Sequence, residues 1–204
     1  MTTDLKTVIA VLLISSTAIY STCHKPLLGC ESSYSFLMNP RVYPDKDTVS
    51  IGDTIWVEIN SSDTFIDAIS NQTIKFDNAE NLGTNMGFVK LVNASPTQLA
   101  DAVNDFQFNL FIGQEIGSTM PQRIKNYLVS YNNGSYKFKL AIITKSSGIY
   151  SFNLGNAANV FKNGEPCPKA NFNFQLIQTN QHYYLYPGGS GVTPTGSDYY
   201  FYVR

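Results

Sequence analysis

The sequence predicts an all-β fold: an antiparallel β-sandwich with at most one or two short helices. Short runs of alternating apolar and polar residues follow one another from Ser33 onward, as in half-buried strands. The 14 Gly and 9 Pro are spread along the chain and mark turns between these runs. Thirteen Tyr and 13 Phe supply the large apolar surfaces that fill a sandwich core.

Composition sets the size of the protein and excludes several classes. A chain of 204 residues fits one ordinary domain. Only 14% of the residues are charged, and the net charge is −1. A nucleic-acid-binding surface and a polybasic membrane patch both need a basic excess that this chain lacks, so neither is expected.

The strands follow from the alternation. Residues 54–59 alternate cleanly, with Ile55, Val57 and Ile59 on one face and Trp56 on the other. One face therefore meets a core, while the single Trp either lines a second layer or faces a partner. Similar alternation predicts strands at 34–38, 72–76, 86–92, 106–112 and 171–177.

The clearest turn belongs to a hairpin predicted at 126–144. Alternating residues with several aromatic side chains run into Asn133-Gly134 and out again, and these two residues adopt the positive φ angles that a tight hairpin turn requires. Ser95-Pro96 instead predicts the start of one short helix, with Ser95 as N-cap and Pro96 at the first helical position.

The segment after this hairpin resembles the turn and strand F of immunoglobulin-like domains. Gly148 and Tyr150 match the tyrosine corner, in which the Tyr hydroxyl bonds back to upstream backbone. Phe152 stands where antibody domains have the second Cys of their disulfide, so the resemblance is to disulfide-free sandwiches. A jelly roll or another sandwich is the alternative.

The N-terminus is typical of an exported protein. Residues 8–20 form an apolar run preceded by Lys6. This run is too short to cross about 30 Å of hydrocarbon as a helix, and it matches the apolar region of a signal peptide. A buried core strand or helix is the alternative interpretation.

Cys23 follows this run and resembles the cysteine of bacterial lipoproteins that receives diacylglycerol and becomes the new N-terminus. Residues 27–30 spell the lipoprotein motif more closely, but His24, Lys25 and Pro26 separate Cys30 from the apolar run. Cys23 is therefore the predicted lipidation site, with Cys30 or plain secretion as alternatives. We therefore expect a signal peptide at 1–22, a lipidated tether at 23–32, and one immunoglobulin-like domain at 33–204 with a Tyr-rich C-terminal extension.

The chain as a whole resembles uncharacterised lipoproteins of Bacteroidetes-type Gram-negative bacteria. The residues that carry this resemblance are Cys23, 34–36, 52–56, 79–83, 157–160, Cys167 and 169–172. The resemblance implies a cell-envelope protein anchored to the outer membrane by its lipid, on the periplasmic side or at the cell surface. It implies no assigned activity.

Lipidation of Cys23 leaves Cys30 and Cys167 in a compartment that tolerates disulfides. These two cysteines are a candidate bridge, which would add on the order of 4 kcal/mol in the chain-entropy model; two unpaired cysteines are the alternative. His24 and His182 do not supply the short paired spacings of a zinc site. No metal or other cofactor is therefore expected.

No catalytic constellation is expected either. A hydrolytic nucleophile needs a nearby base, and the chain offers only two His and no Gly-x-Ser-x-Gly elbow. Asp45, Asp47 and Asp53 are interpreted as turn residues rather than Ca²⁺ ligands. The sequence thus predicts a non-catalytic protein-interaction or structural module; a glycoside hydrolase that uses two of the 15 acidic residues is the less favoured reading.

The candidate ligand-binding residues are tyrosines near the C-terminus, on both sides of a Gly-rich and Pro-rich loop. They are Tyr183, Tyr184, Tyr186, Tyr200 and Tyr202. Displayed together as a flat platform, such rings would stack on sugars or contact an envelope protein. A carbohydrate-binding surface module is therefore the alternative function, unless these rings only roof the sandwich.

Overall fold

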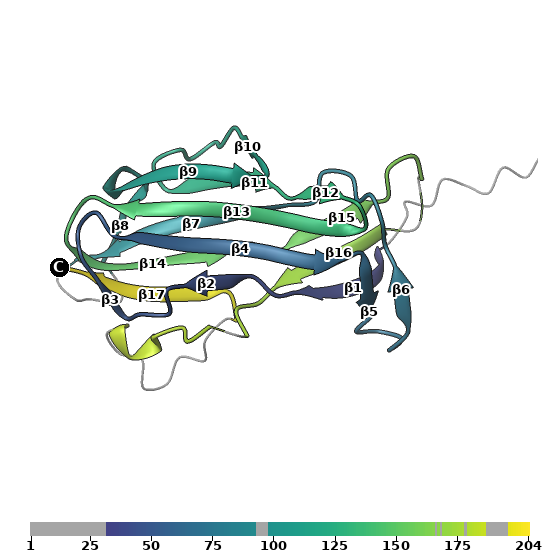
Figure 1. Cartoon of the computed structure of the whole chain (residues 1–204), viewed down its shortest axis with the longest axis horizontal. Helices are drawn as coiled ribbons and strands as arrows, with labels where there is room; N and C mark the ends of the chain where they lie inside the picture. The colour runs from purple at the N-terminus through teal and green to yellow at the C-terminus, as the bar shows by residue number, and fades with distance from the viewer. Residues whose placement is uncertain (1–31, 93–97, 166, 168, 178, 187–195) are drawn as a thin grey trace, which may run out of the picture. The chain divides into compact units, whose positions relative to one another are not determined.

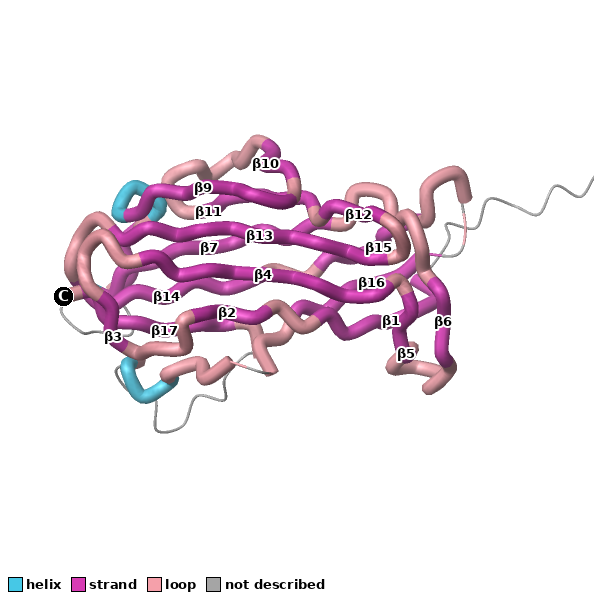
Figure 2. The backbone as a smooth tube through the Cα atoms, in the orientation of Figure 1, coloured by secondary structure: helices cyan, strands magenta, loops and turns pink. Residues whose placement is uncertain are grey.

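The computed structural model describes residues 32–92, 98–165, 167, 169–177, 179–186 and 196–204. They all belong to one unit, Glu31–Arg204. Two sheets made almost entirely of antiparallel pairs face each other with apolar side chains between them (Figure 1), which is the predicted immunoglobulin-like β-sandwich. Figure 2 shows that strands dominate the described chain and that its helices are short.

The first sheet has the strand order β12-β13-β4-β2, and β9 also pairs with β13. Its strands are β2 (Arg41–Tyr43), β4 (Thr54–Ser62), β9 (Phe106–Ile112), β12 (Ser130–Asn132) and β13 (Ser135–Thr144). The longest pairing joins β13 to β4, from Ser135 opposite Ser62 to Ile143 opposite Thr54. β4 and β13 are therefore the central pair of strands in this sheet.

The second sheet has the order β10-β11-β7-β14-β17-β3, and β8 also pairs with β7. Its strands are β3 (Thr48–Val49), β7 (Gly83–Leu91), β8 (Leu99–Asp101), β10 (Gln114–Ile116), β11 (Ile124–Leu128), β14 (Gly148–Leu154) and β17 (Asp198–Val203). All pairs in it are antiparallel except β3 with β17. Figure 1 shows this sheet behind the first one.

A third group of strands closes one end of the sandwich. It comprises β1 (Ser32–Met38), β15 (Ala157–Phe161), β16 (Lys169–Phe174) and the hairpin of β5 (Thr64–Ile66) with β6 (Thr73–Lys75). β1 pairs parallel with β16. Phe172 of β16 contacts the rings of Phe36, Phe65 and Phe76, so this end belongs to the same apolar core.

The predicted hairpin is confirmed only in its second part. β12 pairs with β13 across Asn133-Gly134, whose φ angles of 47° and 75° are the positive values that the turn requires. β11, by contrast, pairs with β7 of the second sheet. The chain therefore crosses from one sheet to the other at Val129, and local sequence does not reveal that crossing.

The helix predicted from Ser95-Pro96 is not continued by the residues after it. Residues 93–97 lie outside the described part of the chain, but Leu99 and Ala100 belong to β8, where they pair with Leu91 and Lys90 of β7. The sheet edge thus satisfies the backbone groups that a helix would have bonded internally. The described helices are two single turns of 3₁₀ helix, η3 (Val103–Asp105) and η4 (Tyr183–Leu185).

Tyr150 occupies the sheet corner that its resemblance to immunoglobulin-like domains implied. Its ring is fully buried, and its hydroxyl oxygen lies 3.1 Å from the Ser146 carbonyl oxygen and 3.0 Å from Asp105 Oδ2. Burial raises the pKa of Tyr150, so the hydroxyl stays a donor. Gly148 has φ +146°, and a Cβ at this position would lie 2.5 Å from Lys90 Cε. Glycine is therefore required at the start of this strand.

Asp67 ties the β5–β6 hairpin to β1. Its carboxylate is buried and accepts hydrogen bonds from the Ser35 backbone N–H at 2.8 Å, the Ser70 N–H at 2.9 Å and the Ser70 hydroxyl at 2.6 Å. Burial alone would raise the pKa of Asp67, but these hydrogen bonds outweigh burial and lower the pKa to about 2. The ionised form is thus the one that the fold selects.

This arrangement predicts acid sensitivity at Asp67. Because the folded-state pKa lies below the ordinary value of 3.8, the stabilisation is complete above about pH 4 and is lost as the pH falls toward 2. Asp67→Ala should lower the free energy of unfolding by about 1–3 kcal/mol at pH 7. Urea unfolding at several pH values should show this difference shrinking on acidification. A difference independent of pH would contradict the assignment, and exposed Asp101→Asn provides the control.

Candidate functional site

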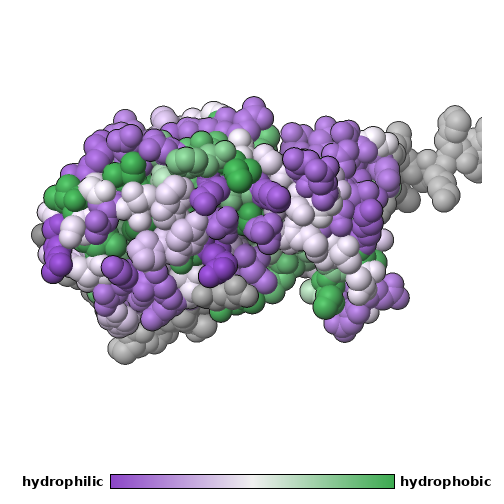
Figure 3. Space-filling model, in the orientation of Figure 1, coloured by the Kyte–Doolittle hydropathy of each residue, from purple (hydrophilic) through white to green (hydrophobic). Residues whose placement is uncertain are grey.

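The outer face of the first sheet carries the aromatic side chains that the core does not use. In β4, Ile55, Val57 and Ile59 are buried against the second sheet, so Trp56 and Glu58 point outward. Figure 3 shows this side of the molecule as a mosaic of hydrophilic and hydrophobic residues. Such a face differs from the wholly apolar surface that another sheet would cover.

Three aromatic rings from three strands meet on this face, and we call Tyr43, Trp56 and Phe111 the aromatic stripe. Tyr43 of β2 lies opposite Trp56 in the strand register, with ring centroids 6.2 Å apart and planes inclined by 13°. The Phe111 ring lies 5.2 Å from that of Trp56 at 51°. Phe111 remains 62% exposed, and Tyr43 and Trp56 are half-buried. The stripe therefore offers ring surface to solvent.

A bulge in β9 places Phe111 in the stripe. Leu110 pairs with Leu140 of β13 and Ile112 with Lys139, so Phe111 is the extra residue between two regular pairs. A bulge of this kind bends its strand and redirects a side chain. Phe111 thus reaches the Trp56 ring although β9 and β4 are separated by β13.

Charged side chains occupy the next positions along the same face. Arg41 and Lys139 both lie opposite Glu58, one on each side of β4. Lys137 lies opposite Asn60 on the same face of β13. The Lys139 ammonium group is also 5.0 Å from the centroid of the Trp56 ring, within cation–π distance. The face therefore combines aromatic surface with three cations and one carboxylate.

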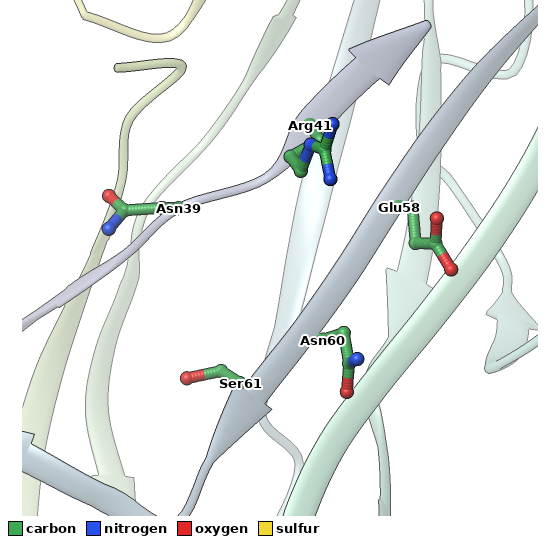
Figure 4. A pocket seen from close by; sticks show the side chains of 5 residues that line it. All are labelled: Asn39, Arg41, Glu58, Asn60 and Ser61. Carbon is green, nitrogen blue, oxygen red and sulfur yellow. The ribbon is translucent and has the colours of Figure 1, made fainter. Parts of the chain in front are cut away.

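A hollow of about 380 Å³ lies beside the stripe, and we call it the polar hollow. Its lining residues are Asn39, Arg41, Glu58, Asn60 and Ser61. Figure 4 shows their side chains around the space where the chain leading into β2 diverges from β4. Because Glu58 and Arg41 are each two positions from a stripe residue along their strands, the hollow and the stripe form one continuous surface.

The C-terminal tyrosines do not form the flat platform that the sequence suggested. The Tyr200 ring is only 7% exposed, and the rings of Tyr183 and Tyr186 meet it edge-on at 71° and 63°. The segment before η4 folds back over β17, with the Tyr200 N–H donating to the Gln181 carbonyl at 3.1 Å. These rings therefore cover the outer face of β17 instead of lying in one plane.

The two exposed tyrosines of that group both donate hydrogen bonds to Asp47 in the turn before β3. Tyr184 is 67% exposed, and its hydroxyl donates to the Asp47 carboxylate. This hydrogen bond lowers the pKa of Asp47. Tyr202 is 40% exposed, and its N–H donates to the Asp47 carbonyl at 2.7 Å. Among the described residues, the Tyr184 ring packs against His182 and the rings of Tyr184 and Tyr202 form no aromatic pair, so they are two separate rings rather than a paired surface.

The remaining polar candidates are engaged in internal bonds. His182 is 4% exposed; its Nδ1 lies 3.1 Å from the Tyr200 carbonyl and its Nε2 lies 3.3 Å from Asp45 Oδ1. Both ring nitrogens thus face oxygen atoms of the protein itself. Asp53 accepts the Ser50 N–H at 2.8 Å, as a turn residue does. Within the described ranges, no group of three His, Cys, Asp or Glu is placed to hold a metal ion.

Several predicted features fall outside the described residues. These are the apolar run at 8–20, Cys23, His24 and Cys30. Cys167 lies exposed between β15 and β16. Because Cys30 is outside the described residues, the pairing of Cys30 with Cys167 stays a prediction. In the part of the chain that the structure describes, no helix is long and apolar enough to span a membrane.

The sequence did not identify the stripe. Alternation left Trp56 either lining a second layer or facing a partner, and it did not connect Tyr43 and Phe111 with Trp56. The alternation of 106–112 does place Phe111 on the face away from the core. Only the pairing of β2 and β9 with their neighbours brings the three rings together.

No protein-family model and no curated protein sequence matches this chain. Among solved structures, it is similar to the type II cohesin dyad from the adaptor ScaA scaffoldin of Acetivibrio cellulolyticus, with 11% identity and a TM-score of 0.28 over 58% of this chain and 37% of that one. It is also similar to a type II cohesin domain from the cellulosome of the same organism, with 11% identity and a TM-score of 0.25 over 68% and 91%. The chain thus spans little more than a third of the dyad, and neither similarity bears on function.

Proposed function

We propose that this protein is a non-catalytic recognition module of the cell envelope, anchored by lipid on Cys23, that binds its partner through the aromatic stripe and the polar hollow. The observation that carries the proposal is the exposed aromatic stripe on the outer face of the first sheet. In the described part of the chain, Figure 1 shows no strand or helix in front of β4 and β13.

The composition of this face supports a binding role. Recognition surfaces are enriched in Tyr, Trp, Phe and Arg, and Trp, Tyr and Arg carry most of the binding energy where it has been measured. All four residue types are present here, in Tyr43, Trp56, Phe111 and Arg41. They are held on paired strands, so little conformational entropy is lost when a partner binds.

The chemistry of the hollow supports a role without catalysis. Hydrolysis of a glycosidic bond uses two carboxyl groups that flank the scissile bond. Glu58 is the single carboxylate among the five residues that line the hollow. The hollow lining also contains no His, Cys or Lys that could act as a base or nucleophile.

The proposed location rests on the N-terminal sequence. The apolar run at 8–20, followed by Cys23, supports export and lipidation, and the resemblance to Bacteroidetes-type lipoproteins supports an outer-membrane destination. We place a disulfide between Cys30 and Cys167 in the same scheme. Such a bridge requires an oxidising compartment outside the cytoplasm.

The lipid anchor predicts a specific N-terminus. Mass spectrometry of the protein from its native membrane should find a mature chain that begins at Cys23 and carries diacylglycerol. Cys23→Ala should abolish both the cleavage and the lipid, whereas the matched variant Cys30→Ala should retain both. Recovery of a chain that still begins at Met1, or of lipid on Cys30, would contradict the proposed anchor.

If the aromatic stripe binds a partner in the envelope, the protein should stay bound to envelope material even when it carries no lipid. A chain that begins at His24, and so lacks both the apolar run at 8–20 and the lipidated Cys23, should sediment with isolated cell envelopes, because the aromatic stripe still contacts its partner. Adding Tyr43→Ala and Trp56→Ala should reduce the sedimented fraction by about tenfold, since each ring contributes at least 1 kcal/mol to typical interfaces. Tyr202→Ala, an aromatic of partial exposure on the opposite sheet, is the control. Equal sedimentation of all three proteins would rule out the stripe.

A further inference from the structure

We infer that the ligand of this face is an acidic polysaccharide, bound with sugar rings stacked on Tyr43 and Trp56 and with its carboxylates held by Arg41, Lys137 and Lys139. This inference rests on the proposed function, because it identifies the ligand of the same surface. Three independent properties of the surface support it: the orientation of its rings, the polarity of its hollow and the sign of its charge.

The orientation of the rings suits a sugar chain. A pyranose ring has an apolar C–H face and a rim of hydroxyl groups, so it stacks on an aromatic face while its rim stays hydrogen-bonded. Tyr43 and Trp56 lie in nearly parallel planes, 13° apart, on adjacent paired strands. Two parallel rings that are fixed on a sheet can contact successive sugars of one extended chain. The edge-on rings around Tyr200 cannot do so.

The polarity of the hollow suits the rim of the sugar. Its lining offers amide groups from Asn39 and Asn60, a hydroxyl from Ser61, a guanidinium from Arg41 and a carboxylate from Glu58. Together these groups provide donors and acceptors for sugar hydroxyls. Its volume of about 380 Å³ falls in the range of small-ligand sites. An apolar anchor from a protein partner would instead bury these polar groups without hydrogen bonds, which is costly.

The charge of the face suits an acid. Arg41, Lys137 and Lys139 stand against the single carboxylate of Glu58, although the whole chain carries a net charge of −1. None of the three cations takes part in the salt bridges found among the described residues. Their charges are therefore available to an anionic ligand.

Lys139 connects the stacking surface with the charge. Its ammonium group lies 5.0 Å from the centroid of the Trp56 ring. A uronic acid that stacks on Trp56 displaces the Lys139 ammonium group from the ring face and brings its own carboxylate within reach of that group. A neutral sugar at the same position would stack on Trp56 but would have no carboxylate for Lys139 to bind. The surface is therefore expected to distinguish uronic acids from neutral sugars by a charge-assisted hydrogen bond.

Trp56 is the single Trp of the chain, so its emission reports directly from the proposed site. Purified full chain in detergent is titrated separately with oligosaccharides of galacturonate, alginate and hyaluronan, and with a neutral galacto-oligosaccharide of matched length. We expect a saturable change in emission with at least one acidic ligand. Binding of the neutral ligand should be about tenfold weaker, and added salt should weaken only the acidic binding.

Calorimetric titration of variants then locates the site. Trp56→Ala and Lys139→Ala should each weaken binding of the acidic ligand by about tenfold. Tyr202→Ala and Lys75→Ala, which alter an aromatic ring and an exposed lysine elsewhere, should leave the affinity unchanged. Circular dichroism of each variant checks that the sandwich is intact.

The outcomes separate this inference from the proposed function. If no acidic oligosaccharide binds, or if Trp56→Ala binds as the unaltered chain does, an acidic polysaccharide is excluded as the ligand of this face. If sedimentation with envelopes nevertheless depends on Tyr43 and Trp56, the face binds a protein partner and the proposed function stands. Equal affinity for acidic and neutral ligands would overturn the assignment of Arg41, Lys137 and Lys139.

Discussion

The alternation of β4 between two environments is the constraint on which the fold and the candidate site both depend. Ile55, Val57 and Ile59 are at most 1% exposed, and burying each side chain contributes about 1.5–3 kcal/mol. A slip of one residue against β13 would turn these three side chains to solvent and drive Trp56 and Glu58 into the core. The same free energy that forms the core therefore fixes Trp56 on the outer face.

The candidate site is a product of strand pairing. The register of β2 with β4 brings Tyr43 beside Trp56, and a bulge in β9 brings Phe111 to the same ring. The next positions of the same pairs bring Arg41, Glu58 and Lys139 together. Aromatic surface and charge thus arise from neighbouring positions of a single sheet, and the fold positions them without a flexible loop.

The sequence predicted the features that local patterns determine. Alternation predicted the β-sandwich and the two faces of β4, and the resemblance carried by Gly148 and Tyr150 made that sandwich immunoglobulin-like. Asn133-Gly134 predicted a tight turn because few other residues adopt positive φ there. Pairing between distant strands has no local signal. The sequence therefore did not reveal that β11 leaves the hairpin for the second sheet, or that Tyr43 and Phe111 meet Trp56.

The tyrosine-rich C-terminus shows that composition alone does not reveal how aromatic rings are arranged. Alternation puts Tyr199, Phe201 and Val203 on one face of β17, and in the structure all three are fully buried. It could not show that the segment before η4 folds back and covers Tyr200. Side chains that look exposed on an isolated strand are covered when a distant segment supplies backbone hydrogen bonds to its edge.

Hydroxyl-radical footprinting of the full chain on native envelopes, compared with the same chain in detergent, tests most directly whether the outer face of the first sheet is the binding surface. This method reports the solvent accessibility of individual aromatic side chains. Our account predicts that Tyr43, Trp56 and Phe111 are oxidised less when the chain is bound to envelopes than when it is in detergent. Tyr184 and Tyr202 should be equally reactive in both conditions. Protection confined to Tyr184 and Tyr202, with the stripe unchanged, would contradict it.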